Sequence, residues 1–300
     1  MTDHCRVTVV INPIKRQAQR AVEVIRDQIA ALGWPAPHVL TTTVAEPGGP
    51  QARTALRDGA DRVVVGGGDG TVREVARELA GTGVGLGIVP LGTGNLFAHN
   101  LGLGGHRLDR VVATALTGPT TALDAGWAGF DGEHHLFLVL AGIGHDAATA
   151  RETREWLKHH AGWLAYAESG VRHALRRPIP MTVSLDDAPP RAVQAWAVLA
   201  GNCSRVRGGI VVFPDARLDD GLLDVMEVTV RYPWQWLPIA VKGLTGLRRD
   251  VPALRYTAAR RVTIASATPV TVQLDGDTFP DVSELHLEVA PGALAVAVDR

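Results

Sequence analysis

The sequence predicts an amino-terminal α/β domain followed by a carboxy-terminal antiparallel β domain. Three observations support this division: strand and helix patterns alternate over the first 120 residues, closely spaced strand patterns follow Leu123, and two glycine-rich segments follow strands of the first part. We expect the α/β domain to cover residues 1–122 together with residues 290–300. The β-rich domain is expected over residues 123–289.

The first part begins with a short β-branched run, Val7 to Ile11, which ends at Asn12-Pro13. Apolar residues then recur at spacings of three and four up to Gly33, which is typical of an amphipathic helix with a glycine stop. Strands that alternate with such helices favour a parallel sheet covered on both faces. Further strands are expected at 39–43, 63–65 and 84–89, and helices at 51–57, 72–79 and 108–116.

The second part has short apolar runs separated by turn residues, which indicates an antiparallel β domain. Two longer stretches, 147–175 and 233–247, are expected to be helical. Strands are expected at 136–140, 181–185, 195–199, 209–213, 222–230, 261–265, 270–274 and 285–289.

Composition excludes several classes of function. The chain has 30 basic and 31 acidic residues, a net charge of −1, which argues against nucleic acid as a partner. Its three lysines, Lys15, Lys158 and Lys242, do not follow glycine, so no Walker A loop is present. The two cysteines, Cys5 and Cys203, are too few for a disulfide framework and are expected to be reduced thiols.

The expected location is the cytoplasm. The amino terminus lacks the order of segments that a secretion signal has. The longest apolar runs fall well short of the about 18 residues that a membrane-spanning helix needs.

The segment Gly66 to Thr71 (GGGDGT) follows the buried strand at 63–65 and precedes the helix at 72–79. Glycines let the backbone approach a ligand closely, and the helix amino terminus attracts anions. A plain turn needs only one or two glycines, so the segment predicts a phosphate-binding loop. Asp69 is unfavourable beside an anion unless it acts through a cation, which suggests magnesium nearby.

A second polar glycine segment, Pro90 to Asn95 (PLGTGN), follows the next strand. Because both segments follow parallel strands, they would lie at the same edge of the sheet, where open α/β sheets bind ligands. A nucleotide-binding crevice is therefore the better interpretation. A dinucleotide fingerprint would require a glycine-rich turn after the first strand, where Asn12-Pro13 stands instead.

These motifs, in this order, resemble the diacylglycerol and sphingosine kinase family of lipid kinases, especially its soluble bacterial members. The first loop alone is shared with NAD kinases and phosphofructokinases, whereas the whole set is more specific. Further matches are Leu123-Asp124, Gly142 to Ala147 (GIGHDA), Pro214 to Leu223 (PDARLDDGLL) and Leu274 to Asp277 (LDGD).

The resemblance implies an α/β nucleotide-binding domain of the NAD kinase and diacylglycerol kinase type and a carboxy-terminal antiparallel β-sandwich. It also implies that ATP binds to the first domain, that the lipid enters a cleft against the second, and that Mg²⁺ is required. Nucleotide contacts are expected from Asn12, Thr43 or its neighbour Thr42, Gly67, Gly68, Asp69, Gly70, Thr71, Val72, Arg73, Thr93 and Asn95. The family's structural magnesium loop maps onto the Arg217 carbonyl, the Asp220 carboxylate and the Leu222 carbonyl.

The family's catalytic base follows a turn Asp-Gly, and that position is Asp277 here. Asp277 and Asp69 are thus the expected catalytic residues, since phosphoryl transfer needs charge neutralisation and removal of one hydroxyl proton. The sequence departs from the family in having aspartate where glutamate is usual at the base. It also has Ile14-Lys15-Arg16 after Asn12-Pro13, so Lys15 or Arg16 is expected to replace a glycine contact with phosphate.

The sequence favours an ATP- and magnesium-dependent kinase for a diacylglycerol-like lipid. Two alternatives stay open: a kinase for a soluble acceptor such as NAD, and a nucleotide-binding regulator that has lost catalysis. The expected partner is a lipid substrate at the inner membrane face, with peripheral attachment, and a homodimer is considered.

Aromatic residues lie near basic clusters in two stretches, residues 151–177 and the segment that holds Trp234 and Trp236. Two interpretations stay open for them. In the first interpretation, these residues form a surface that contacts anionic lipid headgroups. In the second, the aromatic side chains pack in the core. The pairs His134-His135 and His159-His160 are expected to be surface residues rather than metal ligands.

Overall fold

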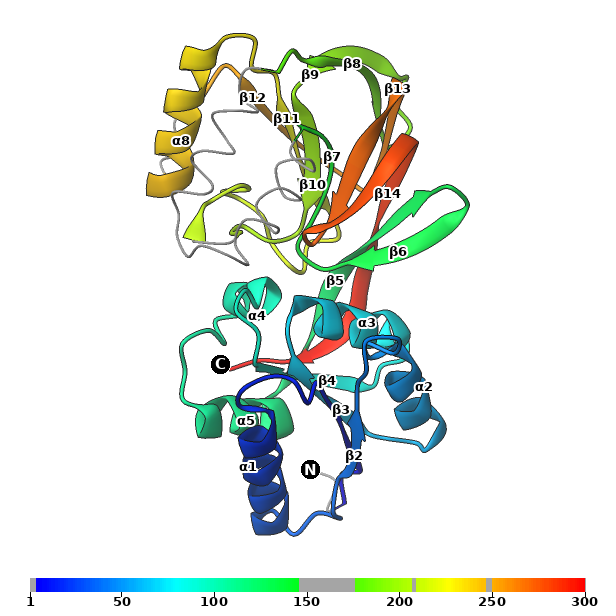
Figure 1. Ribbon diagram of the computed structural model, residues 1–300, viewed down its shortest axis with the longest axis vertical. Helices are drawn as coiled ribbons and strands as arrows, with labels where there is room; N and C mark the ends of the chain where they lie inside the picture. The colour runs from blue at the N-terminus through cyan, green and yellow to red at the C-terminus, as the bar shows by residue number, and fades with distance from the viewer. Residues whose placement is uncertain (1–3, 146–175, 207–208, 247–249, 300) are drawn as a thin grey trace. The chain divides into compact units, whose positions relative to one another are not determined.

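The computed structural model describes residues 4–145, 176–206, 209–246 and 250–299. Within it the chain divides into two compact units (Figure 1): Met1–Ala125 with Pro291–Arg300 form unit 1, and Gly126–Ala290 form unit 2. The expected helix at 147–175 and the pair His159-His160 lie outside the described residues.

Unit 1 is built on a parallel sheet with helices on both faces. The strands lie in the order β4-β3-β1-β2, and the end of β14 is paired in parallel with β4 through Ala295 and Val296. The strands are β1 (Val7–Ile11), β2 (His38–Thr41), β3 (Arg62–Gly67) and β4 (Gly85–Pro90). The helices are α1 (Ala18–Ala31), α2 (Gly49–Arg57), α3 (Asp69–Leu79), α4 (Leu96–Asn100) and α5 (Leu108–Thr117).

The burial of β1 shows why both faces need helices. Successive side chains of a strand point to opposite faces, and all five residues of β1 are buried. Val7, Val9 and Ile11 share one core with α1 and α5. Helix α1 covers this face with Ala18, Ala21, Ile25 and Ile29, which recur at helical spacing.

Unit 2 is mainly antiparallel, with strand order β12-β11-β10-β7-β13-β14; β8 pairs with β13 and β9, and β6 with β5. Its core combines inward-facing residues of these strands, among them Ile143, Val198 and Val225. The strands are β5 (Thr120–Phe130), β6 (Glu133–Phe137), β7 (Leu140–Gly144), β8 (Ile179–Leu185), β9 (Arg191–Ala195), β10 (Ala197–Gly201), β11 (Leu223–Val228), β12 (Leu254–Ala259), β13 (Arg261–Leu274) and β14 (Asp277–Ala297). Of these, β5 begins in unit 1 and β14 ends in it. A short 3₁₀ helix, Pro233–Gln235, leads into α8 (Trp236–Thr245).

Some expected strands were wrong. The stretch 209–213 contains only an isolated bridge between Arg205 and Val211, because Gly209 has a φ of 75° and donates its N–H to Val206 in a turn. The run 136–140 is split between β6 and β7, because the N–H groups of Leu138 and Val139 donate to a side chain rather than to a strand. The runs 261–265 and 270–274 are one strand, and β5, β9, β12 and α4 were not expected.

No helix among the described residues is long and apolar enough to cross a membrane.

Unit 2 also contains a buried ion pair, which no sequence pattern predicts. Glu227 on β11 has 2% of its side chain exposed, and both of its oxygens accept hydrogen bonds from the guanidinium of Arg191 on β9. The pair fixes the side chains of two strands relative to each other. Removing one partner would leave the other charge buried without compensation.

We expect Arg191→Met to lower the free energy of unfolding by about 3–5 kcal/mol, because it leaves the Glu227 carboxylate buried and unpaired. The double variant Arg191→Met with Glu227→Met should recover most of that loss, since the charge is then absent. Denaturant unfolding of both variants checks this. A double variant as unstable as the single one would show that packing, not charge, dominates.

Candidate active site

Two glycine-rich loops meet at the carboxyl ends of β3 and β4. The carbonyl of Gly67 accepts the N–H groups of both Leu91 (2.8 Å) and Gly92 (3.1 Å), so the backbone of one loop is bonded directly to the other. The first loop leads into α3 at Asp69, and the second leads into α4 at Leu96. Both predicted loops are therefore parts of one substructure of unit 1.

Close packing requires glycine at one position of each loop, Gly92 against the first loop and Gly67 against Thr71 of its own loop. A Cβ added to Gly92 would lie 2.7 Å from the Cα of Gly68 and 2.8 Å from Oδ1 of Asn95. A Cβ added to Gly67 would lie 2.7 Å from the Cβ of Thr71. Real Cβ atoms do not approach other atoms so closely, so these positions require glycine.

The amino terminus of α3 has the properties of an anion site. Gly68 occupies the N-cap position and supplies no side-chain cap, and the first N–H groups of a helix have no partner within the helix. A Cβ added to Gly70 would have no atom within 4 Å, so the space beside the first turn is open. A Cβ added to Gly68 would lie 3.8 Å from Nζ of Lys15, which brings an ammonium group to the loop.

Asp69 links the two loops through its side chain. Its Oδ1 accepts the N–H of Leu96 (2.5 Å), the first residue of α4, and Oδ2 would lie 2.7 Å from a Cβ added to Gly94. Its position in the first turn of α3 is also favourable for a carboxylate. Asp69 thus has a structural reason to be acidic, which the sequence analysis did not consider, in addition to the predicted link to a cation.

Asn95 closes the second loop rather than facing away from it. Its side chain accepts the N–H of Gly92 (3.0 Å) and donates to the carbonyl of the same residue (2.6 Å). Its φ of 48° is left-handed, a conformation that asparagine adopts more readily than most residues. Thr93, between them, is exposed.

The segment after β1 lies against the first loop. Asn12 donates its backbone N–H to Gly66 (2.8 Å), and its side-chain amide lies 3.5 Å from the hydroxyl of Thr71. Thr42 is buried with 4% of its surface exposed, whereas Thr43 is exposed and its hydroxyl accepts the N–H of Glu46 (3.0 Å). Val72 is buried, so only its backbone can meet a ligand, and Arg73 is half-buried.

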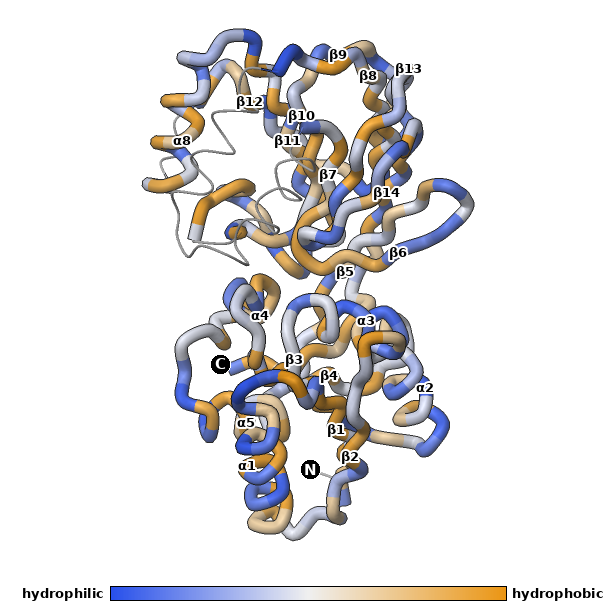
Figure 2. The backbone as a smooth tube through the Cα atoms, viewed as in Figure 1, coloured by the Kyte–Doolittle hydropathy of each residue, from blue (hydrophilic) through white to orange (hydrophobic). Residues whose placement is uncertain are grey.

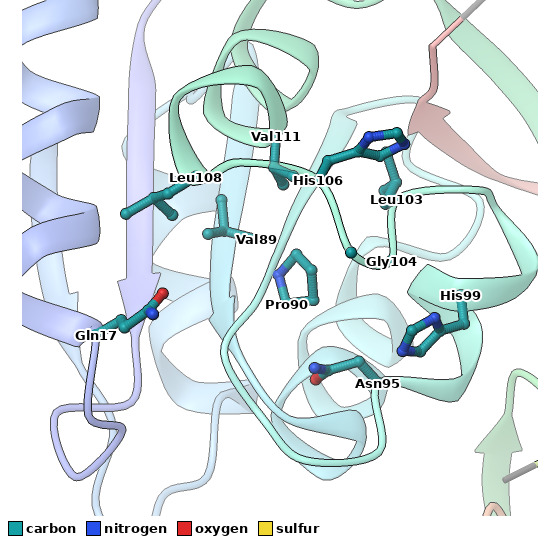
Figure 3. Close-up of a pocket in the computed structure, with 11 residues that line it drawn as sticks. Gln17, Val89, Pro90, Asn95, His99, Leu103, Gly104, His106, Leu108 and Val111 are labelled. Carbon is teal, nitrogen blue, oxygen red and sulfur yellow. The ribbon is translucent and has the colours of Figure 1, made fainter. Parts of the chain in front are cut away.

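A small pocket of about 110 Å³ adjoins the second loop (Figure 3). Asn95 and His99 border it on the side of α4, and Gln17 borders it on the side of α1. Ligand clefts typically have about 300–1,000 Å³. The pocket alone is therefore too small for a nucleotide.

In unit 2, Asp277 follows a tight hairpin turn. Asp275 and Gly276 both have positive φ values, 50° and 90°, which is the pattern of a two-residue type I′ turn. Asp277 is the first residue of β14, lies opposite Leu274 and is half-buried. The turn places its carboxylate on a fixed hairpin.

The turn itself is held by the side chain of Asp275, which is 8% exposed. Its carboxylate accepts three backbone N–H groups, those of Leu138 (2.9 Å), Val139 (2.9 Å) and Leu140 (3.0 Å). Its own N–H donates to the carbonyl of Leu140 (2.8 Å). From the sequence, Asp275 is predicted only as a turn residue, because no local pattern indicates these three bonds to residues 138–140.

Asn202 is a second residue that the sequence analysis missed. It follows Gly201, which pairs with Leu140 on one side and Asp224 on the other, so Asn202 lies at the same end of the sheet as the Asp275 turn. Asn202 is 1% exposed, and neither polar atom of its amide has a hydrogen-bond partner. No sequence signal distinguishes it from a loop asparagine.

The predicted magnesium loop precedes β11 at this end of the sheet. Oδ1 of Asp220 accepts the N–H of Leu222 (3.1 Å). The pKa of Asp224 is raised to about 6, mainly by burial and further by the charges of Asp220 and Asp215. Asp220 and Asp215 thus both lie near Asp224 and add negative charge beside the start of β11.

The residues of this loop fit magnesium only with help from the backbone. Among the described residues, no three acidic, histidine or cysteine side chains are close enough together to hold a metal ion. One carboxylate, that of Asp220, with the carbonyls of Arg217 and Leu222 leaves positions for water, which Mg²⁺ usually retains. All-oxygen ligands are those that Mg²⁺ prefers.

Comparison with known proteins gives matches over nearly the whole chain. Residues 6–128 match the diacylglycerol kinase catalytic domain, and residues 139–298 match the YegS C-terminal NAD kinase beta sandwich-like domain. The chain belongs to this lipid kinase family. The family and the fold class inferred from the motifs are thereby confirmed.

Individual relatives agree with this assignment. A protein of Chromohalobacter salexigens named "Probable lipid kinase YegS-like" is 31% identical over 252 residues, 82% of this chain and 78% of the relative. A protein of Mycobacterium tuberculosis named "Diacylglycerol kinase" is 27% identical over 288 residues, 96% of this chain and 88% of the relative. A crystal structure described as a diacylglycerol kinase from Bacillus anthracis has the same fold, with a TM-score of 0.72, 21% identity and coverage of 98% and 97% of the two chains.

The structure brings some of the family's expected site residues together and leaves others in separate places. Gly67 to Thr71, Asn12 and Asn95 belong to one bonded group of loops in unit 1, to which Lys15 is added. Asp277 and the Asp220 loop belong to unit 2.

The two glycines Gly92 and Gly70 provide a matched test of the loops. We expect Gly92→Ala to lower the free energy of unfolding by about 1–3 kcal/mol, because the new methyl group overlaps the Gly68 backbone. Gly70→Ala has open space and should keep or slightly raise the melting temperature. If the loop binds phosphate, Gly70→Ala should nevertheless raise the KM for ATP. Equal melting temperatures for the two variants would contradict the close contact between Gly92 and the Gly68 backbone.

Magnesium should stabilise the protein through Asp220. We expect Mg²⁺ to raise the melting temperature of the wild type, and Asp220→Ala to remove this rise because the only side-chain ligand of the loop is lost. Asp219→Ala is the control, since Asp219 is exposed and bonded to Arg217 (3.3 Å). If Mg²⁺ still raises the melting temperature of Asp220→Ala, the ion does not bind at this loop.

Proposed function

We propose that the protein transfers the γ-phosphate of ATP to a hydroxyl group of a diacylglycerol-like lipid. Membership in a lipid kinase family supports a kinase, and the names of its relatives point to lipid acceptors. The observation that carries the proposal is the open amino terminus of α3, with Lys15 beside it. A chain without a Walker loop needs such a site to hold phosphates.

The phosphates of ATP would lie against the loop from Gly67 to Thr71. Backbone N–H groups at the start of α3 would donate to phosphate oxygens, and the helix dipole would favour their negative charge. The Lys15 ammonium, which lies beside Gly68, would neutralise part of that charge. Lys15 and the start of α3 would thus neutralise phosphate charge, as the lysine of the P-loop does in proteins that have that loop.

Asp277 would act as the general base. Its carboxylate accepts the proton of the lipid hydroxyl while the hydroxyl oxygen forms a bond to the γ-phosphorus. The bond between that phosphorus and the β–γ bridging oxygen breaks, and ADP leaves with the electron pair. Because the Asp275 carboxylate holds the turn through three N–H groups, Asp277 would be presented in a fixed position.

Magnesium, when bound, would neutralise charge that develops on the transferred phosphate and its leaving group. Each unit has its own candidate ligands for magnesium: the Asp220 loop of unit 2 for a structural ion, and the Asp69 carboxylate of unit 1 for an ion beside the phosphates. Asp69 would use the oxygen that does not accept the Leu96 N–H.

The test is transfer of labelled γ-phosphate from ATP to a panel of acceptors. The panel contains diacylglycerol, monoacylglycerol, ceramide, sphingosine and NAD. Labelled product from a lipid supports the proposal. Product only from NAD would make the protein a kinase for a soluble acceptor, and nucleotide binding without any product would make it a regulator.

Within an active enzyme, Asp277→Ala should lower kcat by about 100- to 10,000-fold, the usual range for loss of a general base. The affinity for ATP should remain nearly unchanged, because the base handles only the acceptor proton. Asp277→Glu should retain activity, since the family usually has glutamate there. Retained turnover in Asp277→Ala, measured at saturating ATP, would eliminate Asp277 as the base.

A further inference from the structure

Helix α8 carries a continuous apolar surface that faces solvent. Tyr232, Trp234, Leu237, Val241 and Leu244 are 53%, 69%, 71%, 44% and 74% exposed, and we call them the α8 surface. Trp234, Leu237, Val241 and Leu244 follow one another at intervals of three, four and three residues, which places them on one side of the helix. Figure 2 shows the hydrophobic colour over much of α8.

The opposite side of α8 packs against the rest of unit 2. Trp236 packs against Trp196 with ring centroids 4.7 Å apart, and the Gly243 carbonyl accepts the N–H of Val211 (2.9 Å). Lys242, the only charged residue of the helix, is 7% exposed, with its ammonium 5.1 Å from the ring centre of Tyr256. The helix therefore packs through one side and turns its hydrophobic residues outward.

The two tryptophans of this segment lie in different environments. Trp236 is a packing residue, whereas Trp234 is exposed and stacks on Tyr232 with ring centroids 4.5 Å apart and an interplanar angle of 4°. Aromatic side chains with polar tips are typical of positions at the interface between water and lipid.

The charge around the α8 surface favours an anionic partner. Residues 231–246 and 204–213 contain no aspartate or glutamate, although the chain has 31 acidic residues in 300. The second segment is joined to α8 by the hydrogen bond between Val211 and Gly243. Exposed arginines occur in both segments, Arg231 beside Tyr232 and Arg205 in the bridge with Val211.

We propose that the α8 surface docks on a lipid bilayer with anionic headgroups, the apolar side chains entering the interface and the arginines contacting the headgroups. This inference rests on the proposed function and names the surface through which the kinase reaches a lipid acceptor. An anionic bilayer is the partner that matches an apolar surface flanked by exposed arginines and by no acidic residue in these two segments. Helices of this kind bury their apolar side about 5–10 Å deep.

The test uses the double variant Leu237→Glu with Leu244→Glu, and Val44→Glu as the matched control. Val44 is an equally hydrophobic residue of unit 1 that is 98% exposed. Sedimentation with vesicles of phosphatidylcholine and phosphatidylglycerol, without nucleotide, measures binding. We expect the affinity of the double variant for these vesicles to be lower than that of the wild type by at least about tenfold, because two apolar contacts are lost. Val44→Glu should bind like the wild type, and vesicles of phosphatidylcholine alone should bind all proteins more weakly.

Several results would overturn the proposal. Wild-type protein that does not sediment with vesicles, or a double variant that sediments equally well, excludes the α8 surface as the docking site. A clear fall in the melting temperature of the double variant would mean that another part of this chain covers the helix. A wild-type dimer that the double variant dissociates, with vesicle binding unchanged, would assign the surface to a second copy.

The experiment separates this inference from the proposed function. Vesicle binding needs no ATP, so a protein without kinase activity would still give a result. Conversely, phosphorylation of a short-chain acceptor dissolved in water should be the same in the double variant and the wild type. Loss of that activity in the double variant would show that the substitutions disturb the enzyme rather than its docking.

Discussion

The contact between the backbones of Gly68 and Gly92 is the constraint on which the candidate phosphate site depends. It allows the Gly67 carbonyl to accept two N–H groups from the second loop and brings the Asp69 carboxylate to the N–H of Leu96. Gly68, on the first loop, is also the N-cap residue of α3, so the first turn of this helix has no side-chain cap. A helix start of that kind is costly unless water or an anion satisfies its N–H groups.

In unit 2, the turn before Asp277 is held by a side chain rather than by a contact between two backbones. A buried carboxylate, that of Asp275, replaces strand pairing for three successive N–H groups at the junction of β6 and β7. Charge-assisted bonds of this type are stronger than those between neutral groups. Because the turn Asp275-Gly276 continues directly into Asp277, the position of the candidate base follows from the same three bonds. The carboxylate that holds the turn and the carboxylate of the candidate base are thus separated by one residue.

The α8 surface places large hydrophobic side chains where they do not contribute to the core of unit 2. Leu237 and Leu244 are more exposed than most leucines, although the helix packs well through Trp236 and Gly243. A helix that only had to cover unit 2 would carry polar residues on its outer side. The charges of the chain are unevenly distributed although its net charge is near zero. Acidic residues lie around Asp220, whereas residues 231–246 contain none.

The sequence by itself determined the alternation of strands and helices in unit 1, the two glycine loops and the Asp-Gly turn, because these depend on neighbouring residues. It also identified the family, since several motifs in a fixed order are specific together. Only the tertiary structure decided that Asp275 replaces strand pairing at 138–140, that Lys15 reaches Gly68, and that Trp234 and Trp236 face opposite ways. Those features join residues far apart in the chain or depend on which side of a helix is covered, and neither property is encoded in local spacing.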